Sequence, residues 1–333
     1  MISFSSYSDT QEFMTRFCEL PEKLSHNKNR PIPKKEYWSY LLSVFPEVRK
    51  ELFIVENNGT DVGRICVNIS EGNPGVAFFG MLEYSIEHPE VANELFSAAE
   101  TWAKEQGAIT VIGPVDINVW FGNRFQTDGF EAQFSWAPNN PREYYEAAIA
   151  FGYIQDQGYS SRFFNTLKEQ VDRTKPGHDL AISEGYTFRH LDLNDAGDIN
   201  RLYELNVDSF KVNYLYEPIS KEQYFSTHIE FIKGSDLGYS YFIEDMNKIP
   251  RGYVYCFMDG DCLIVKSILI QSDYQGAKLS SALIHRACRE ASDLGVKRGA
   301  GVLVRDGNIS SRFYEKIGDP YLVHRYHMVK KSL

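Results

Sequence analysis

The chain has 333 residues, of which 43% are hydrophobic and 24% charged, and its net charge is −10. This length exceeds the roughly 100–200 residues of one ordinary domain, so the sequence predicts two domains. Residues 1–165 carry 13 Lys and Arg against 22 Asp and Glu. That balance argues against a nucleic-acid partner, because such binding depends on neutralising phosphates. No apolar run approaches the roughly 18 residues of a membrane span, and the N-terminus lacks signal-peptide features, so we expect no membrane association.

The cysteines are odd in number, scattered, and contain no Cys-x-x-Cys pair. They are Cys18, Cys66, Cys256, Cys262 and Cys288. Such a set argues against a disulfide framework and against structural zinc. The sequence therefore predicts a cytoplasmic protein without a metal site.

In the first half, the apolar patterns predict three strands, a long helix, another strand and a second helix. In chain order they lie near residues 52–54, 63–69, 76–82, 89–106, 110–112 and 141–151. Gly107 and Gly152 directly follow the two helices, as glycine often does at helix ends. Residues 166–185 are polar, include Pro176 and Gly177, and predict a linker between a first domain (1–165) and a second domain (186–333).

The second half repeats this order of elements. Strands are predicted at 251–258 and 262–270, a helix ending at 294, a strand at 301–305, a helix at 310–317 and a strand near 321–329. The segments AAETWAKEQGAITVIG and ACREASDLGVKRGAGV can be aligned, as can YYEAAIAFGY and FYEKIGDPY. This self-similarity at a long period predicts a duplicated α/β domain.

The segment SDYQGAKLSSALIHRA, residues 272–287, joins an apolar strand to the start of a helix. A strand, a tight turn and a helix in succession present backbone N–H groups to phosphate. We interpret this corner as a candidate phosphate site. The alternative interpretation is an ordinary strand–turn–helix connection without a ligand.

Residues 268–318 resemble the GCN5-related N-acetyltransferase (GNAT) superfamily. The resemblance rests on the strand end Ile268-Leu269-Ile270, on Gln275 opening an Arg/Gln-x-x-Gly-x-Gly/Ala signature, and on Asn308 ahead of Phe313-Tyr314 and Gly318. It implies an α/β (α+β) fold of two tandem GNAT-like domains, a layout similar to that of mycothiol synthase. Each domain would be a mixed, mostly antiparallel central sheet flanked by helices, with a splayed strand pair in the C-terminal copy. The implied acyl donor is acetyl-CoA, or another derivative of coenzyme A.

By this resemblance, the loop before the helix would bind the coenzyme A pyrophosphate. Its residues are Gln275, Gly276, Ala277, Lys278, Leu279 and Ser280. Lys278 and Ser280 stand where the family has small residues. A Cβ at such a position crowds a ligand, whereas a lysine cation and a serine hydroxyl can each hold phosphate. The backbone of Ile268, Leu269 and Ile270 would pair with the pantetheine arm and polarise the acyl carbonyl.

The resemblance also assigns catalytic roles. Tyr314 corresponds to the family's usual general acid, which protonates the departing thiolate. Asn308 and Ser311 would orient the cofactor or the tetrahedral intermediate, although Asn308 would serve equally well as a helix cap. Several family members place a Glu or His where this chain has Ile264. Lys266, two residues further along the same side of the strand, is predicted as a base, an anchor for an anionic group or a surface lysine.

Substrate contacts in the family come from the segment after the first strand, here 198–225. Within it, Tyr214 and Tyr216 are candidates to wall a pocket and Glu217 to face an amine, although helix packing explains the aromatic residues equally well. In the first copy, the sequence SIEHPEVANEL stands where a phosphate loop is expected. Glu87 and Glu90 would repel a pyrophosphate there, so this copy is predicted to be non-catalytic.

The sequence therefore predicts an acyl-CoA-dependent N-acyltransferase that acetylates an amine of a small molecule in its C-terminal domain. Two alternatives stay open. One is an aminoacyl transferase of the tandem-GNAT type, and the other is a non-catalytic sensor or scaffold that binds acyl-CoA.

Overall fold

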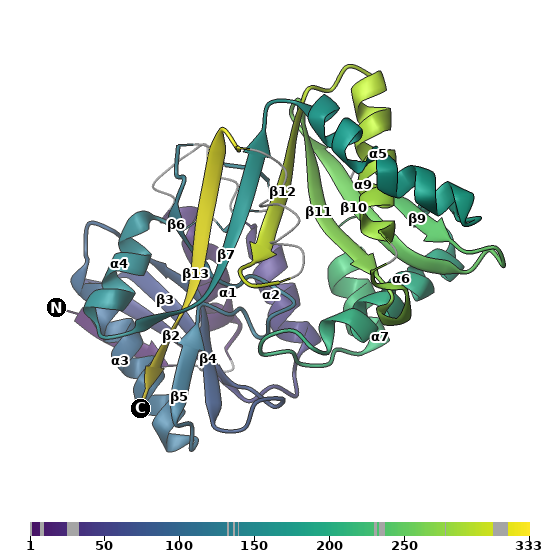
Figure 1. The fold of residues 1–333 in the computed structure, drawn as a ribbon. Helices are drawn as coiled ribbons and strands as arrows, with labels where there is room; N and C mark the ends of the chain where they lie inside the picture. The colour runs from purple at the N-terminus through teal and green to yellow at the C-terminus, as the bar shows by residue number, and fades with distance from the viewer. Residues whose placement is uncertain are drawn as a thin grey trace. The chain divides into compact units, whose positions relative to one another are not determined.

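A computed structural model describes the chain apart from residues 1, 7–9, 25–32, 132, 136, 139, 230–231, 233–236, 277 and 309–318, and apart from the side chains of 2–6. The chain divides into two compact units. The first contains Met1–Gly158, Leu215–Glu217 and Arg325–Leu333, and the second contains Tyr159–Tyr214 and Pro218–His324. Figure 1 shows the helices and strands of both units.

The first unit contains a mixed sheet in the order β1-β2-β3-β4-β5-β13, and β6 pairs with β13. Its strands are β1 (Ile2–Ser6), β2 (Lys50–Asn57), β3 (Thr60–Ile69), β4 (Val76–Tyr84), β5 (Thr110–Gly113), β6 (Phe125–Asp128) and β13 (Leu322–Ser332, from Arg325 onward in this unit). Its helices are α1 (Gln11–Lys23), α2 (Lys35–Val44), α3 (Glu90–Glu105) and α4 (Arg142–Ala150). β4 and β5 run parallel, and the other pairs run antiparallel.

The core of the first unit follows from alternation along β3. Ile65 and Val67 are buried in one cluster with Val91 of α3. Arg64 points to the opposite face, where its guanidinium lies 4.5 Å from the ring centre of Trp38 in α2. The helices α3 and α2 therefore cover opposite faces of β3, as the period of two residues in a strand requires.

The second unit contains a mixed sheet in the order β7-β12-β11-β10-β9-β8. Its strands are β7 (Ile154–Phe164, from Tyr159 onward in this unit), β8 (Thr187–His190), β9 (Tyr241–Glu244), β10 (Pro250–Asp259), β11 (Cys262–Ile270) and β12 (Arg298–Arg305). Its helical elements are α5 (Leu167–Ser183), α6 (Ala196–Phe210), α7 (Lys221–Tyr224), the π-helical turn η1 (Phe225–Ile229), the 3₁₀ turn η2 (Ser272–Tyr274) and α9 (Leu279–Asp293). Only β11 and β12 run parallel among the strand pairs that the structure describes here. The predicted mixed, mostly antiparallel sheets flanked by helices are confirmed.

The predicted linker at 166–185 is wrong, because Leu167–Ser183 form helix α5. The Thr166 side chain accepts a hydrogen bond from the N–H of Glu169 and so caps the helix. The Pro-Gly pair that suggested a break lies inside the helix, where Gly177 allows α9 to approach closely. A Cβ at Gly177 would lie 2.7 Å from the Cβ of Ser281. The polar pattern of the segment reflects a helix that packs along one face only.

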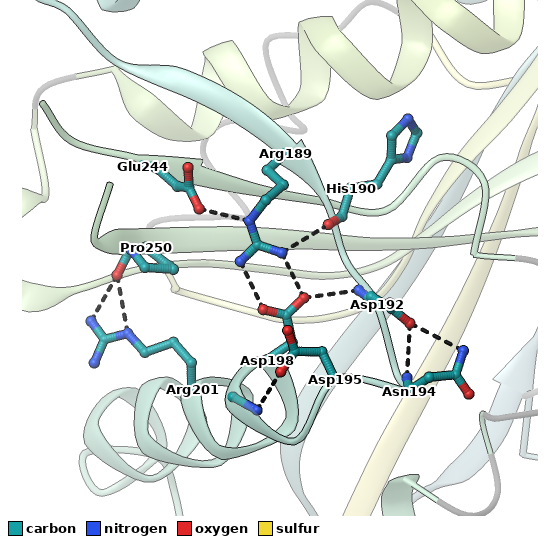
Figure 2. A network of polar contacts seen from close by, with 10 residues as sticks. Arg189, His190, Asp192, Asn194, Asp195, Asp198, Arg201, Glu244 and Pro250 are labelled. Atoms are coloured by element: carbon teal, nitrogen blue, oxygen red, sulfur yellow. Dashed lines mark hydrogen bonds and ion pairs between the residues drawn. The ribbon is translucent and has the colours of Figure 1, made fainter. Parts of the chain in front are cut away.

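Helix α6 is joined to the sheet by an ion-pair network whose two carboxylates are buried (Figure 2). Arg189 of β8 donates from two nitrogens to the two oxygens of Asp198, each at 2.7 Å, and from Nε to Glu244 of β9 at 2.7 Å. Asp198 is 4% exposed and also accepts the N–H of Asp192. A bidentate pair with its remaining lone pairs satisfied offsets the cost of burying charge. The position of α6 matters because it covers the functional face described below.

Most of the predicted elements correspond to helices and strands of the structure. The helices expected at 89–106 and 141–151 are α3 and α4, and the strands expected at 251–258 and 262–270 are β10 and β11. The strand predicted at 301–305 is the second half of β12, which begins at Arg298. The helix predicted at 310–317 lies outside the residues that the structure describes.

Candidate functional site

Strand β11 contains a one-residue bulge at Lys266. On β10, Tyr255 and Cys256 are consecutive, but their partners on β11 are Ser267 and Val265. Lys266 is therefore the extra residue between two paired ones. Bulges of this kind bend a strand and change the direction in which side chains point, and they are frequent next to active sites.

The bulge exchanges the two faces of β11. Before it, Leu263 and Val265 belong to the core formed with α9, and after it Ile268 and Ile270 do. Because side chains alternate along a strand, the pattern before the bulge directs Lys266 to the face opposite α9, and the pattern after it directs Ser267 to that same face. Helix α6 covers this opposite face. The three residues from Lys266 to Ile268 are each only partly buried.

Beyond the bulge, β11 and β12 diverge. Within the described part of both strands, their parallel register ends at Val265 and Gly301, although the strands continue to Ile270 and Arg305. Leu303 of β12 has a left-handed φ of 54°, and its N–H donates to Ser161 of β7 at 2.9 Å. β12 thus turns toward β7 and leaves the edge of β11. This is the splayed pair expected in the second copy.

The loop after β11 has two residues with left-handed backbone. Gly276 has a φ of 93°, and Lys278, the N-cap of α9, has a φ of 58° without any side-chain cap bond. Gln275 donates from Nε2 to the Ile270 carbonyl at 3.3 Å, which ties the loop to the strand end. Lys278 therefore adopts a conformation that normally favours glycine. Its side chain is exposed, so it does not fill the corner between the strand and the helix.

Sequence reasoning missed the residues that hold the start of this loop. The Gln271 Oε1 accepts from Arg201 of α6 at 3.2 Å and from Arg251 of β10 at 3.3 Å. The Arg251 guanidinium also lies 4.6 Å from the ring centre of Tyr274. Two cations from different elements thus converge on one side-chain carbonyl directly ahead of the loop.

The structure places the other predicted site residues unevenly. Leu269 is the second-last residue of β11, Leu279 is buried at the first position of α9, and Ser280 follows it half-buried. The Asn308 N–H donates to the Arg305 carbonyl in the turn after β12. Three predicted residues lie outside the described residues, so their roles stay predictions: Ala277, Ser311 and Tyr314.

The predicted substrate residues Tyr216 and Glu217 belong to the first unit, whereas Tyr214 belongs to the second. Glu217 is 7% exposed, and its Oε1 accepts from the Ser70 hydroxyl and from the Gly72 N–H. Burial raises the pKa of Glu217. Its carboxylate therefore already has partners within the first unit, and contact with a substrate amine stays a prediction.

Strand β4 of the first unit also has a bulge. Arg64 pairs with Glu83 and Cys66 with Gly80, so Met81 and Leu82 together face the single residue Ile65, and Met81 has a φ of 48°. Here the chain itself fills the space beside the strand. The Val115 N–H donates to the Phe79 carbonyl, and the Met81 N–H donates to Asp116 Oδ1, each at 2.6 Å.

The closure of the first unit is tight. A Cβ at Gly80 would lie 2.1 Å from the Val115 carbonyl oxygen, so the segment after β5 packs directly on the backbone of β4. Burial raises the pKa of Asp116 to about 6. This arrangement supports the expectation that the first copy does not bind an acyl donor.

A small apolar cavity of about 20 Å³ lies in the second unit where β11 and β12 begin to diverge. Its lining includes Val265 and Gly301, the last paired residues, and Cys288 of α9. Burial raises the pKa of Cys288 to about 12, which leaves its thiol unreactive near neutral pH. The cavity has room for about one or two water-sized groups.

Within the residues that the structure describes, no group of three or more His, Cys, Asp or Glu side chains is arranged to hold a metal ion. Among the helices of the same residues, none is long and apolar enough to span a membrane. All five cysteines are buried and free.

Comparison with known proteins gives a family and a fold. Residues 199–319 match the acetyltransferase (GNAT) family. A tandem GNAT protein from the clavulanic acid biosynthesis pathway superimposes over 100% of this chain and 98% of its own, with a TM-score of 0.58 and 13% identity. A probable N-acyltransferase from Enterococcus faecalis superimposes over 100% of this chain and 73% of its own, with a TM-score of 0.58 and 10% identity.

Two curated proteins are similar in sequence. The bacterial ceramide synthase of Caulobacter vibrioides is 23% identical over 193 residues, which cover 54% of this chain and 48% of that protein. Protein YghO of Escherichia coli is 31% identical over 86 residues, which cover 24% and 22%. The chain thus spans about half or less of the length of these relatives. Residues 199–319 thus match the acetyltransferase (GNAT) family, and the chain has the fold of tandem GNAT proteins.

Proposed function

We propose that the chain is an acyl-CoA-dependent N-acyltransferase whose second unit transfers an acetyl group from acetyl-CoA to an amine of a small molecule. One observation carries this proposal: bulged β11 diverges from β12 and leads directly into the uncapped start of α9. The family match of residues 199–319 supports the same activity.

The residues at this corner fit an acyl-CoA. The start of α9 has no side-chain cap, so its first N–H groups and the helix dipole favour a pyrophosphate there. The exposed Lys278 adds a cation beside it. Beyond Val265, β11 has no register partner in the described part of β12, and the amides of a pantetheine arm would pair along this edge near Leu269. When bound, the thioester supplies an activated acyl carbonyl.

The chemistry requires little of the protein beyond positioning and charge stabilisation. The amine nitrogen attacks the carbonyl carbon, forms the C–N bond and then loses one proton to solvent. The C–S bond breaks, and the sulfur leaves as a thiolate that takes up a proton. Backbone N–H donors near Leu269 would stabilise the oxyanion that develops on the carbonyl oxygen. Tyr314 stays the predicted acid for the thiolate, and Lys266 stays a predicted base or anchor.

The length of the acyl group is the least constrained feature. The match to an acetyltransferase family supports an acetyl donor. The similarity to a ceramide synthase over 193 residues favours a longer donor, because a ceramide carries a long acyl chain on its amide nitrogen. Both donors lead to an amide, so the bond formed is common to the two candidates.

A titration and a turnover screen test the proposal. Calorimetry with acetyl-CoA and palmitoyl-CoA measures donor binding, and release of free thiol measures transfer to spermidine, glucosamine, amino acids and sphinganine. We expect acetyl-CoA to bind and thiol release to depend on an amine. Binding without turnover on any amine would favour the sensor, and transfer only from aminoacyl-tRNA would favour the aminoacyl transferase. Turnover unchanged in Tyr314→Phe would remove the assignment of Tyr314 as the acid.

A further inference from the structure

Two partly buried side chains attach the loop between β11 and α9 to the rest of the second unit. From Gln271 to Gly276, only Gln271 and Tyr274 are partly buried, and the other four residues are exposed. Both of these side chains contact the same arginine. Arg251 Nη1 donates to Gln271 Oε1 at 3.3 Å, and the guanidinium lies 4.6 Å from the ring centre of Tyr274. Arg201 Nη2 donates to the same Oε1 at 3.2 Å, so Gln271 joins the loop to two elements at once.

The two arginines are held in place by other partners. Arg201 of α6 donates from Nε and Nη2 to the Pro250 carbonyl at 3.1 and 2.7 Å (Figure 2), and from Nη1 to Glu204 at 2.9 Å. Arg251 of β10 donates from Nε to Asp245 Oδ2 at 2.8 Å, and the side chains of this pair are 17% and 14% exposed. Each charge is thus balanced by a carboxylate, and each guanidinium keeps its direction without the loop.

The two guanidiniums fix the orientation of the Gln271 amide. An arginine N–H can only donate, so the amide atom that lies between Arg201 and Arg251 must be the oxygen and not the nitrogen. Hydrogen bonds from charged donors are also stronger than those between neutral groups. The Gln271 side chain is therefore held from two sides at the point where the strand ends.

The backbone of Gln271 joins the strand to the loop. Its N–H donates to the Arg251 carbonyl at 2.8 Å, which extends the pairing of β11 with β10 by one residue. Its own carbonyl accepts the Tyr274 N–H at 2.9 Å, which closes the turn η2. Gly276 and Lys278, with their left-handed φ values of 93° and 58°, follow this turn. A change in the direction of the chain at Gln271 would therefore also move the N–H groups of the loop.

We propose that Gln271 is a positioning residue for the acyl donor, and that its hydrogen bonds with Arg201 and Arg251 hold the loop N–H groups in the conformation that binds the donor's pyrophosphate. This inference rests on the proposed function, and it names the side chain that prepares the loop before the donor binds. The arginines act through Gln271, since their charges are already balanced by Glu204 and Asp245. A loop that must first regain this conformation binds the donor more weakly, in proportion to the fraction of molecules that have it.

Calorimetry with acetyl-CoA on the full chain tests the assignment. Gln271→Met keeps the length of the side chain and removes the accepting oxygen, so it is expected to raise the Kd for acetyl-CoA about 5- to 30-fold. Gln271→Asn keeps the amide but is one methylene shorter and cannot reach both arginines, so it is expected to resemble Gln271→Met. A Kd for Gln271→Asn equal to that of wild type would show that the two hydrogen bonds do not position the loop, and would overturn the inference.

Inorganic pyrophosphate gives the measurement that a merely structural role would not change. It is expected to compete with acetyl-CoA for the wild-type chain, and its inhibition constant is expected to rise in Gln271→Met by the same factor as the Kd for acetyl-CoA. Because pyrophosphate has no pantetheine arm, an equal factor would place the lost affinity at the loop. An unchanged inhibition constant, or no competition with the wild-type chain, would overturn the inference.

Gln106→Met is the matched control. The Gln106 Oε1 accepts from Arg49 Nη1 at 3.2 Å within the first unit, so the same residue change removes the same kind of hydrogen bond outside the second unit. Its Kd for acetyl-CoA is expected to equal that of wild type. Equal Kd values for Gln271→Met and wild type, or the same rise in Gln106→Met, would overturn the inference and leave the proposed function intact. Absence of acetyl-CoA binding by the wild-type chain would overturn both.

Discussion

The two units contain the same bulged strand beside a diverging parallel neighbour, but only one of the two places is open. In the first unit, Val115 and Asp116 bond to the backbone of β4 at Phe79 and Met81. In the second, β12 turns toward β7 after Gly301, and within the described residues nothing pairs with β11 in its place. The difference lies in the segment that follows each parallel neighbour, because the bulged strands themselves correspond.

The loop after β4 and the loop after β11 also differ, in backbone conformation and in charge. Between β4 and α3 the chain has no residue with a positive φ, and it presents Glu87 and Glu90. Between β11 and α9 it has Gly276 and Lys278 in left-handed conformations. A backbone that turns in this way directs successive N–H groups into one concavity. The difference supports the proposal that the loop before α9, and not the loop before α3, binds the anionic donor, and four changes can break or sharpen this comparison.

The largest expected effect is on stability, and it comes from the buried carboxyl group of Asp116, which accepts the Met81 N–H of β4. Burial raises the pKa of Asp116 from 3.8 to about 6, so the folded protein holds that proton more tightly than the unfolded chain does. The wild-type protein therefore loses stability as the pH rises from about 4 through 6. Asp116→Asn removes this titration and is expected to be more stable relative to wild type above pH 6, by up to about 3 kcal/mol.

Urea unfolding of both proteins between pH 4 and pH 8 measures the difference. The gap between the two midpoints should widen with rising pH and become constant above about pH 7. A difference between the two midpoints that is the same at every pH would show that Asp116 has an ordinary pKa, and the contact between Asp116 and β4 would then not bury a carboxyl group. Acetyl-CoA binding should be the same in both proteins, because the proposed donor site lies in the second unit.

The second effect separates the open corner from the rest of α9. Gly276 and Gly295 lie at opposite ends of this helix with φ values of 93° and 89°, and at neither would a Cβ meet another atom within 4 Å. Alanine is thus disfavoured by the backbone alone at both positions, by roughly 1–2 kcal/mol. Gly276→Ala is expected to weaken acetyl-CoA binding about 5- to 30-fold, because binding must restore the loop conformation.

Gly295→Ala is the matched control, with a similar loss of thermal stability and an unchanged Kd measured by calorimetry. Equal Kd values for the two variants would show that the donor does not bind at the loop before α9. A matched pair of this kind is useful because it keeps the residue change and the helix constant and varies only the end of the helix that is altered.

The third effect divides the two roles of Lys278. Its left-handed conformation disfavours a side chain with a Cβ, so Lys278→Gly is expected to raise the stability of the protein by about 0.5–1 kcal/mol. Lys278→Met keeps the Cβ and removes the cation, and it should weaken acetyl-CoA binding a few-fold with little change in melting temperature. Loss of stability in Lys278→Gly would contradict the conformational argument, and tighter binding in Lys278→Met would contradict the electrostatic one.

The parts of this comparison that could be predicted from sequence are those set by local pattern. The apolar run 262–270 and the helical spacing of Leu279, Leu283 and Ala287 indicate β11 and α9 directly. The bulge at Lys266 has no such signal, because it depends on the register with β10 and the sequence around it is apolar on both sides. The Pro176-Gly177 pair was misleading for a different reason. Gly177 is needed where α5 packs closely against α9, and this contact can be seen only in the folded structure.

The buried polar network that joins Asn206 of α6 to Tyr253 of β10 and Tyr224 of α7 was missed, although a signal for it existed. Asn206 follows Leu202 by four residues and lies on the buried face of α6, where a polar side chain needs a partner. A search for polar residues on apolar helix faces would have found Asn206 but not Tyr253, because the pairing of the two is tertiary. The sequence could therefore have indicated that α6 covers a polar site, and only the structure shows which strand completes it.

The smallest effect concerns a histidine on α9 behind the open corner. His285 is 5% exposed, its Nδ1 bonds to the Val171 carbonyl of α5 at 2.9 Å, and its ring lies 4.5 Å from that of His178. Burial lowers the pKa of His285 below 6.5, so the unfolded chain takes up this proton before the folded protein does. Stability contributed by the neutral side chain is complete above pH 6.5 and declines as the pH falls below it.

His285→Asn keeps a donor for the Val171 carbonyl and removes the titration, so its urea midpoint should approach that of wild type as the pH falls from 7.5 to 5. If the urea midpoints of the two proteins differ by the same amount at every pH in that range, the titration of His285 does not contribute to the pH dependence of stability.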